Sequence, residues 1–423
     1  MVAQKSDFNE LKAIVGTEHI ASGAEAGLFG VDESYPQVVV HPGTYEEVAS
    51  VIRLANSTGL AVIPWGTGNQ MHFGNVPAKY DIALSLSRLT QLIEHEPADL
   101  TVSCQAGMHT NELNRRVGES GQVVPFRISI TPFGTVGGML ASGDHGNPRD
   151  FTIGMRVVTA DGRITRAGGK VVKNVAGYDL CKLYIGSLGT LCVIVEATFK
   201  LRALPQTGEE VDVEFESLET ACHFMFRLEQ RGLAIQTAVL TKLEIIAGSD
   251  YVPIGGYRAR VHFGGTLAAI DRSHREASQI AEEIGGLSFD TERLQGAPSD
   301  TPKWVLDGHP LACSVLVPPA HTAQMFSALE AEGQHPTILA WPLTGELEAN
   351  WPGVDDHSTF VKRLKGIAAR SGAILSIRQC SPDLKRRIDV FGDPPPAFEL
   401  MRRVKQQFDP NGILSPGRFV GRL

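Results

Sequence analysis

Two glycine-rich segments, at residues 64–70 and 131–143, contain the residues best suited to chemistry. The first reads P-W-G-T-G-N-Q and follows a β-like run at residues 60–64. Glycine lets the chain turn tightly, and it lets bare backbone N–H groups approach an anion. Two such segments on one chain therefore predict a ligand with phosphates and a long body, which means a nucleotide cofactor.

The first segment does not predict a Rossmann dinucleotide site. That site needs G-x-G-x-x-G where a strand turns into a helix, with an acidic residue about 20 residues later. Here Met71 stands where the third glycine is required, and residues 71–77 do not open a helix. Because G-x-G alone is also typical of a surface turn, the surrounding segments decide the interpretation.

Composition limits the class of protein. The chain has 423 residues, 43% hydrophobic and 20% charged, which predicts two or three globular domains. A net charge of -8 argues against a general nucleic-acid binder, which usually carries a basic face. No apolar run approaches the roughly 20 residues that span a bilayer, and the N-terminus lacks the apolar core of a signal peptide. We expect a cytoplasmic protein that reaches a membrane only through partners.

The six cysteines are scattered, and no C-x-x-C motif occurs. Iron–sulfur and zinc sites built from four cysteines normally show tight local spacing. The sequence therefore predicts no metal site, and it predicts that the cysteines are buried small apolar residues.

Strand and helix signals alternate around the first glycine segment. Thr44 and Glu47 have the spacing of a capping box, apolar residues follow at helical spacing, and Gly59 suits the helix end. The patterns predict strands at 38–40, 82–86 and 100–104, and helices at 45–58 and 111–117.

The pattern of predicted elements changes near Pro205, shortly after the end of a β-branched run at residues 191–201. Before it, Asp161-Gly162 is a hairpin signal between two strands. Beyond it, the patterns predict an antiparallel sheet covered by helices, followed by a stiff proline linker and a last helix. The expected elements are strands at 211–215, 258–263 and 312–317, helices at 218–231, 271–284 and 397–408, and the linker at 393–396.

Together these segments resemble the vanillyl-alcohol-oxidase-type (PCMH-type) FAD-binding domain over about residues 36–205. The resemblance rests on P-x-G-x-G, then T-V-G-G-x-x-A-x-G-x-x-G, then G-Y-D-L at 177–180 and G-S-L-G-T at 186–190. The C-terminal F-D-P-x-G-I-L-x-P-G-R stretch also fits. The resemblance implies an α+β fold: an N-terminal segment (1–35), a two-subdomain FAD-binding domain (36–205), a cap domain with an antiparallel sheet and helices (206–392), and a C-terminal segment that returns to the FAD domain (393–423).

The segment K-N-V-A-G-Y-D-L at residues 173–180 narrows the resemblance to the glycolate oxidase branch. The D subunit of that enzyme usually carries a later G-H-x-G-D-G-N-x-H segment, whereas this chain has only D-G-H-P at 307–310. The chain is therefore most similar to the smaller, FAD-binding E subunit. The resemblance implies an FAD-dependent oxidoreductase acting on CH–OH donors, with a catalytic flavoprotein D subunit and an iron–sulfur F subunit as partners.

The resemblance also implies the residues that hold the cofactor, while no catalytic residue is assigned. FAD is expected to be non-covalent, because Asn69 stands where covalent members carry a histidine. The expected FAD-binding residues are Gly66, Thr67, Gly68, Asn69 and Gln70 around the pyrophosphate, Thr131, Pro132, Gly137, Gly138, Ala141, Gly143 and Gly146 along the nucleotide, Gly189 near the flavin, and Val193 and Val195 beside adenine.

Several residues have a structural interpretation as well as a functional one. Lys173 and Asp179 could touch the cofactor or form a salt bridge, and Arg418 could meet flavin or substrate or cap the C-terminal turn. Cys181 is expected to be structural rather than an activated thiol. The remaining members of this group are His145, expected in an exposed turn, and Trp304, Trp341 and Trp351, expected as core residues or as anchors of a subunit interface.

Three functions stay open at this point. The chain could be the flavin subunit of a complex that oxidises glycolate, a 2-hydroxy acid, to glyoxylate and passes electrons to an iron–sulfur partner. It could be a self-sufficient FAD-dependent 2-hydroxy-acid oxidoreductase, or a non-catalytic, flavin-loaded assembly subunit.

Overall fold

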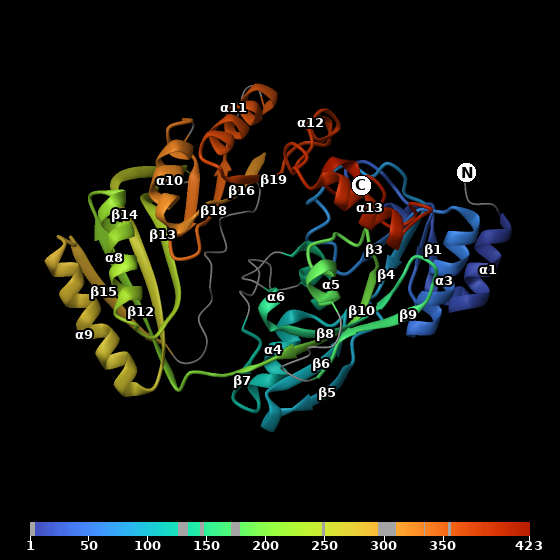
Figure 1. Ribbon diagram of the computed structural model, residues 1–423, viewed down its shortest axis with the longest axis horizontal. Coiled ribbons are helices and arrows are strands. Elements are labelled where there is room, and N and C mark those ends of the chain that lie inside the picture. The colour runs from blue at the N-terminus through green and yellow to red at the C-terminus, as the bar shows by residue number, and fades with distance from the viewer. Residues whose placement is uncertain are drawn as a thin grey trace. The chain divides into compact units, whose positions relative to one another are not determined.

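The computed structural model describes residues 5–125, 134–143, 148–170, 178–247, 250–294, 310–333, 335–353 and 357–423. Contacts divide the chain into two units (Figure 1), and the predicted α+β class is confirmed. Unit 1 contains residues 1–203 and 385–423, and unit 2 contains residues 204–384. The four-part division expected from the resemblance stays a prediction.

The first sheet of unit 1 has the order β1-β2-β4-β3, with β2 and β3 parallel to β4. Its central strand positions are buried on both faces: Val38 and Val40 contact the main core, while Val39 contacts a smaller cluster with Trp65. Such burial is typical of parallel strands covered on both sides. The elements are β1 (Ile20–Ser22), β2 (Val38–Val40), β3 (Val62–Trp65), β4 (Ile82–Ser85), α1 (Lys5–Val15), η1 (Thr17–His19), α2 (Ala24–Gly27) and α3 (Tyr45–Thr58).

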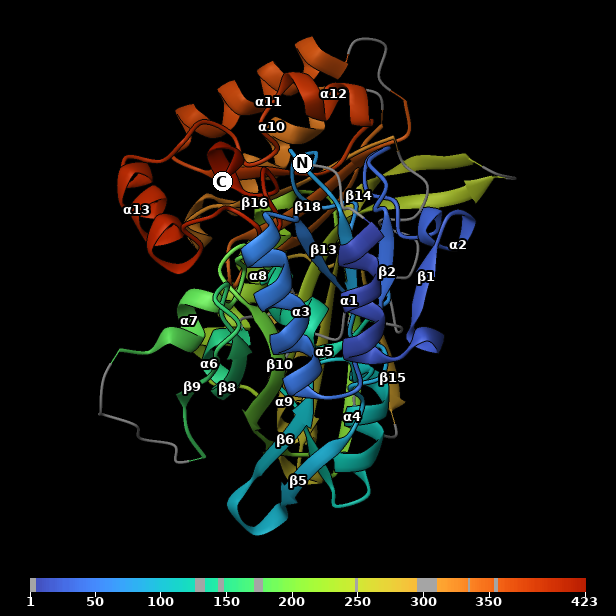
Figure 2. The ribbon, with the colours of Figure 1, turned by 90° about the vertical axis from the view of Figure 1, so that its right-hand side faces the viewer.

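Helix α3 begins and ends as its sequence predicts. The Thr44 hydroxyl accepts a hydrogen bond from the Glu47 N–H at 3.1 Å, and Gly59 closes the helix in the left-handed region at φ 68°. The Glu47 carboxylate, however, accepts from the Gly43 N–H rather than from Thr44. The apolar face of α3 is buried in the main core, and α1 lies beside it (Figure 2).

The second sheet of unit 1 is antiparallel and has the order β5-β6-β10-β8-β9. The predicted hairpin is present, because β8 pairs with β9 across the turn that contains Asp161 and Gly162. The elements are β5 (Leu92–Glu96), η2 (Pro97–Asp99), β6 (Thr101–Gln105), α4 (Thr110–Gly118), β7 (Gln122–Val123), α5 (Val136–Ser142), α6 (Pro148–Phe151), β8 (Thr152–Val158), β9 (Ile164–Gly168), α7 (Leu180–Tyr184), β10 (Val193–Lys200) and β11 (Arg202–Ala203).

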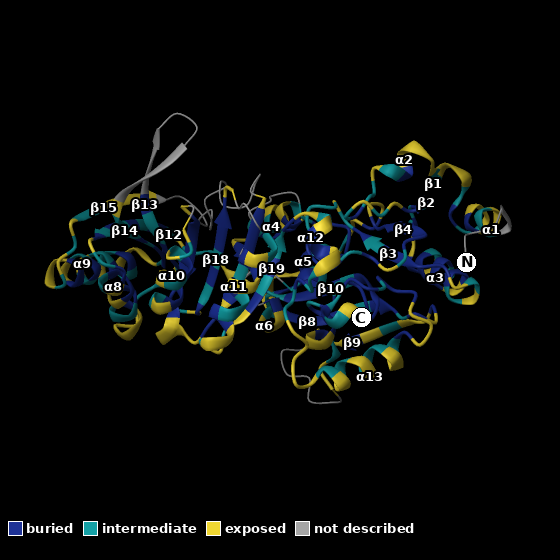
Figure 3. Cartoon of the chain, turned by 90° about the horizontal axis from the view of Figure 1, so that it is seen from above, coloured by how far each residue is buried: buried dark blue, intermediate teal, exposed yellow. Residues whose placement is uncertain are grey.

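Unit 2 is one eight-stranded sheet of order β15-β12-β14-β13-β17-β18-β16-β19 with helices packed on it. On β12 the alternate residues Val211, Val213 and Phe215 are fully buried, and Phe215 contacts Phe224 of α8. Figure 3 shows the buried strands beside the partly exposed helices. The elements are β12 (Thr207–Phe215), α8 (Leu218–Gln230), β13 (Ile235–Ala247), β14 (Asp250–Gly265), α9 (Leu267–Glu283), β15 (Ser288–Leu294), β16 (Leu311–Leu316), η3 (Pro319–His321), α10 (Thr322–Glu330), β17 (Thr337–Trp341), β18 (Glu346–Trp351), α11 (His357–Arg370) and β19 (Ile374–Gln379).

The C-terminal segment packs against β3 of unit 1. The Val62 N–H donates to the Ile413 carbonyl at 2.8 Å, and the Ser415 N–H donates back to the Val62 carbonyl at 2.9 Å. This places the C-terminal stretch beside the strand that leads into the first glycine segment. Its elements are α12 (Pro382–Arg387), α13 (Phe398–Phe408) and η4 (Val420–Arg422).

All six cysteines are buried and free, as the sequence predicts. Trp341 and Trp351 are buried within unit 2, and Trp351 contacts Phe360 edge to face. They are therefore core residues, and their prediction as interface anchors is wrong. Trp304 lies outside the described residues. Within the described ranges, no helix is both long and apolar enough to cross a membrane.

Candidate functional site

A pocket in unit 1 is lined by both glycine segments. It also receives residues from the turn after α7 and from the C-terminal stretch. The lining residues are Ile63, Pro64, Gly66, Thr67, Gly68, Asn69, Gln70, Met71, Thr110, Gly134, Thr135, Gly138, Met139, Ala141, Ser142, Leu188, Gly189 and Arg418.

The two glycine segments meet at Gly66 and Thr135. A Cβ atom at Gly66 would lie 2.1 Å from the Thr135 Oγ1 atom, a distance that no side chain tolerates. Thr135 in turn caps helix α5, because its hydroxyl accepts from the Gly138 N–H at 3.2 Å. Glycine at position 66 is therefore required for the first turn to reach the start of α5.

The turn at residues 66–69 offers backbone N–H groups to the pocket. No hydrogen bond among the described residues uses the N–H groups of these four consecutive residues. Gly68 has φ 86°, in the left-handed region, and a Cβ there would lie 2.5 Å from the Trp65 ring. Consecutive N–H groups in such a turn form a concave site for an anion.

Helix α5, unlike the turn at residues 66–69, has its first N–H groups in hydrogen bonds within the protein. Although its glycines favour tight turns, the second glycine segment is helical over residues 136–142. The first N–H groups of α5 are already used: Val136 donates to the Met108 carbonyl at 2.9 Å and Gly137 to the Ala106 carbonyl at 2.7 Å. Among the described residues of the two glycine segments, the turn at 66–69 therefore has unused N–H groups, while α5 supplies a wall of the pocket.

The turn after α7 closes the pocket against α5. The Leu188 N–H donates to the Ala141 carbonyl at 2.9 Å, and the Gly186 N–H donates to the Leu140 carbonyl at 2.9 Å. A Cβ at Gly143 would lie 2.7 Å from the Gly186 Cα, so two backbones pass in contact there. Gly143 and Gly186 thus shape the wall without lining the pocket.

Arg418 supplies positive charge to the pocket wall. Its side chain is 3% exposed, and its guanidinium donates to the carbonyls of Met71 and Phe73. Burial lowers the pKa of Arg418 to about 10, so the group is still a cation at neutral pH. Arg418 thus stabilises the turn at residues 71–73 and lines the pocket, while its contact with flavin or substrate stays a prediction.

The structure brings together part of the predicted FAD-binding set. Gly66, Thr67, Gly68, Asn69, Gln70, Gly138, Ala141 and Gly189 line the pocket, whereas Gly137 and Gly143 lie behind its wall. Val193 and Val195 are fully buried in β10 and do not line it. The predicted residues Thr131, Pro132 and Gly146 lie outside the described residues.

Sequence reasoning missed several lining residues. Thr135 was detectable, because a threonine three residues before Gly138 has the spacing of a helix N-cap. Thr110 and Met139 carry no local signal, since they join the pocket through tertiary contacts such as the 2.9 Å hydrogen bond from the Thr110 N–H to the Gly134 carbonyl.

Two other residues considered in the sequence analysis, Asp179 and Cys181, have structural roles. Asp179 caps α7, accepting from the Lys182 N–H at 3.4 Å. Cys181 is buried, and burial raises its thiol pKa to about 12, so it is not an activated nucleophile. Lys173 and His145 lie outside the described residues. In the part of the chain that is described, no three His, Cys, Asp or Glu side chains gather as a metal site would require.

Comparison with known families matches two segments of the chain. Residues 36–168 match the FAD binding domain, and residues 393–419 match the C-terminal domain of FAD linked oxidases. These two matches contain the first turn, α5 and Arg418, which together line the pocket.

Individual relatives agree with these matches. A D-lactate dehydrogenase of Archaeoglobus fulgidus is 28% identical, covering 91% of this chain and 92% of that protein. Glycolate oxidase subunit GlcD of Bacillus subtilis is 31% identical over 62% of this chain and 59% of its own length. The crystal structure of p-cresol methylhydroxylase with bound substrate superposes with a TM-score of 0.74 at 15% identity, covering 98% of this chain and 97% of that one, and so shares the fold.

FAD fits the pocket by its chemistry. Its diphosphate is an anion, which the N–H groups at 66–69 and the Arg418 cation can bind. The glycines at 66 and 138 leave room where a side chain would enter the pocket or its wall.

Proposed function

We propose that this FAD-dependent oxidoreductase, an FAD-linked oxidase with the PCMH-type fold, oxidises a small 2-hydroxy acid, with glycolate as the first candidate. The observation that carries the proposal is the anion-binding pocket of unit 1 in a chain similar to a D-lactate dehydrogenase and to a glycolate oxidase subunit. Both relatives are named for the oxidation of acids that bear a hydroxyl group next to the carboxylate.

The chain's own part in the reaction is to hold and orient the cofactor. The N–H groups of residues 66–69 bind the diphosphate, Thr135 fixes α5 against that turn, and Arg418 adds positive charge. When bound there, FAD would supply the two-electron oxidation of the hydroxyl-bearing carbon. We assign no substrate base, because the described contacts identify no residue for that role.

We infer that the electrons leave through partner proteins. The sequence has no clustered cysteines to hold an iron–sulfur relay of its own. The similarity to subunit GlcD and the K-N-V-A-G-Y-D-L motif favour a place in a glycolate oxidase complex. The missing G-H-x-G-D-G-N-x-H segment favours the role of an E-type subunit, beside a D-type flavoprotein and an iron–sulfur F-type protein. In this proposal FAD is bound without a covalent link, and the assembly contacts the membrane only through its partners.

A self-sufficient D-lactate dehydrogenase is the second candidate. It is favoured by one observation, which is that the similarity to the archaeal D-lactate dehydrogenase extends over 92% of that protein. This candidate needs no partner for turnover with an artificial acceptor.

The test is anaerobic flavin reduction in the native assembly, purified through a tag on this chain. We expect glycolate to bleach the visible flavin band faster than D-lactate does, and acetate, which lacks the hydroxyl, to leave it unchanged. Faster bleaching by D-lactate would favour the second candidate, with D-lactate as the substrate in place of glycolate. A flavin that no 2-hydroxy acid reduces would overturn the proposed function.

A further inference from the structure

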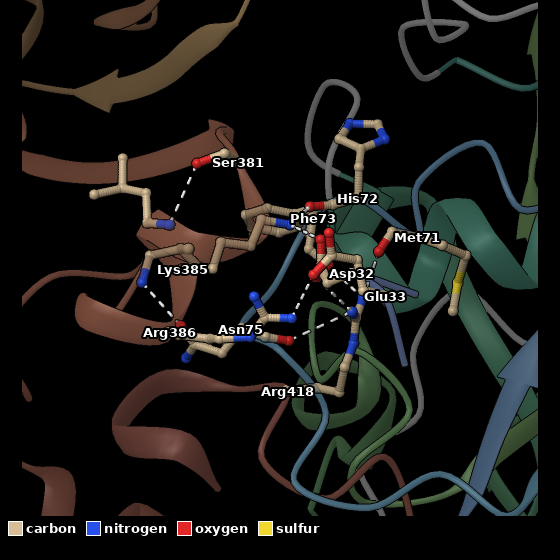
Figure 4. Close-up of polar contacts among 12 residues, drawn as sticks. Asp32, Glu33, Met71, His72, Phe73, Asn75, Ser381, Lys385, Arg386 and Arg418 are labelled. Atoms are coloured by element: carbon tan, nitrogen blue, oxygen red, sulfur yellow. Dashed lines mark hydrogen bonds and ion pairs between the residues drawn. The ribbon is translucent and has the colours of Figure 1, made fainter. Parts of the chain in front are cut away.

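Figure 4 shows a buried cluster formed by the charged side chains of Asp32, Lys385 and Arg418. Of these three, only Arg418 lines the pocket. The Lys385 Nζ atom lies 2.7 Å from the Asp32 Oδ1 atom, and the side chains are 1% and 7% exposed. The other Asp32 oxygen lies 3.7 Å from the Arg418 guanidinium. Two buried cations therefore share one buried carboxylate.

The cations of this cluster bind the backbone that continues from the FAD turn. Lys385 donates to the His72 carbonyl, and Arg418 donates to the carbonyls of Met71 and Phe73. Three consecutive carbonyls, directly after the turn at 66–70, are thus held by charged donors. Hydrogen bonds from a charged donor are about twice as strong as neutral ones.

Asp32 itself is presented by a turn that is unfavourable without support. Asp32 and Glu33 have φ 48° and 63°, and Val31 and Ser34 exchange two backbone hydrogen bonds of 2.8 Å across them. Two consecutive positive φ values suit Asn-Gly, not Asp-Glu. The side chains of both residues form ion pairs with consecutive residues, Asp32 with Lys385 and Glu33 with Arg386.

The neighbouring residue Asn75 extends the same connection to the C-terminal stretch. Its amide donates to Asp389 at 3.1 Å and to the Phe419 carbonyl at 2.9 Å, and its oxygen accepts from the Val390 N–H at 3.0 Å. Segments more than 300 residues apart along the chain therefore converge on residues 71–75.

We propose that Asp32, Lys385 and Arg418 form a latch that holds residues 71–73, and through them the turn at 66–70, in the conformation that binds FAD. Asp32 and Lys385 act as positioning residues, because neither lines the pocket. Removing the Lys385 ammonium frees the His72 carbonyl and leaves Asp32 with only the more distant Arg418 cation, so the turn at 66–70 loses its binding conformation.

The adjacent pair Glu33–Arg386 provides a matched control. It lies on the same turn and the same helix, but its side chains are 60% and 44% exposed. An exposed pair of this kind contributes little to stability. Replacing Arg386 therefore removes a cation from the same helix while the buried pair of Lys385 and Asp32 stays intact.

The experiment compares Lys385→Met, Lys385→Arg and Arg386→Met, measuring the FAD dissociation constant and the apoprotein melting temperature. We expect Lys385→Met to raise the dissociation constant by about 10- to 100-fold, Lys385→Arg to restore part of the affinity, and Arg386→Met to match the parent. At saturating FAD, Lys385→Met should bind as much flavin per chain as the parent does, which identifies the defect as one of cofactor affinity.

If Lys385→Met does not fold, Asp32→Asn provides the same test, with the same rise in the dissociation constant expected. An FAD affinity for the latch variants equal to that of Arg386→Met would overturn the proposal, even if the apoprotein melts earlier. The proposal would also be contradicted if both latch variants failed to fold, because the Asp32–Lys385 pair would then be needed for the folding of unit 1 and not for positioning the turn alone. The test measures FAD affinity and not substrate oxidation. Its failure can therefore be distinguished from a failure of the proposed function.

Discussion

Replacing Gly138 with aspartate will strip FAD from the chain, while replacing it with asparagine will leave most of it bound. Gly138 lines the pocket, and a Cβ there meets only the Thr135 hydroxyl, at 3.1 Å. A carboxylate about 4 Å from a phosphate costs roughly 4 kcal/mol at an effective dielectric constant of about 20. That energy corresponds to about a thousandfold change in the FAD dissociation constant. Because solvent screens part of the repulsion, we expect the dissociation constant of Gly138→Asp to exceed that of Gly138→Asn by about 100-fold or more.

The fold should survive this change. Gly138 is the third residue of α5, and an acidic side chain near a helix N-terminus stabilises the helix. The loss of FAD would therefore report on the pocket rather than on unfolding, which circular dichroism of the two variants checks. Equal affinities of Gly138→Asp and Gly138→Asn for FAD would show that no phosphate lies beside α5.

Gly68→Asp should also strip FAD, but for two reasons at once. The charge opposes the phosphate, and a side chain at φ 86° would collide with the Trp65 ring. Gly138 is therefore the cleaner position, because only the charge differs between its two variants.

The second large effect concerns partners. We expect the isolated, FAD-loaded chain to oxidise glycolate at the background rate of a dye-coupled assay, and the assembly purified with its partners to turn over many times. The physical reason is that the described contacts of this chain identify no substrate base, and its scattered cysteines provide no exit relay.

The control for this comparison is the assembly that carries Gly138→Asp in this chain. If the FAD of this chain takes part in turnover, that assembly should be slow even though every partner is present. Rapid glycolate turnover by the lone chain would contradict the need for partners and would favour the self-sufficient enzyme.

Much of the scaffold was predictable because its signals are local. The Thr44 cap and Gly59 end of α3, the hairpin at Gly162 and the alternation along β12 each depend on neighbouring residues. The first glycine turn was predictable for the same reason, since the need for a positive φ at Gly68 is a property of that residue. The pairing order of the eight-stranded sheet has no such local signal.

The site was less predictable where it depends on contacts between distant segments. The residues around Gly66 do not predict its contact with Thr135. The residues around Asp32 likewise do not predict its ion pair with Lys385, which is 353 residues away. The donor pattern of α5 also depends on tertiary contacts, because the Met108 and Ala106 carbonyls use its first N–H groups. Because of these contacts, we expect the anion to bind at residues 66–69 rather than at both segments.

The most direct test of the central claim is flavin analysis of the purified chain. We expect a yellow protein from which acid precipitation releases the flavin into solution as intact FAD, because the N–H groups at 66–69 and the Arg418 cation would hold it without a covalent bond. A chain that stays colourless and takes up no added FAD would contradict the claim.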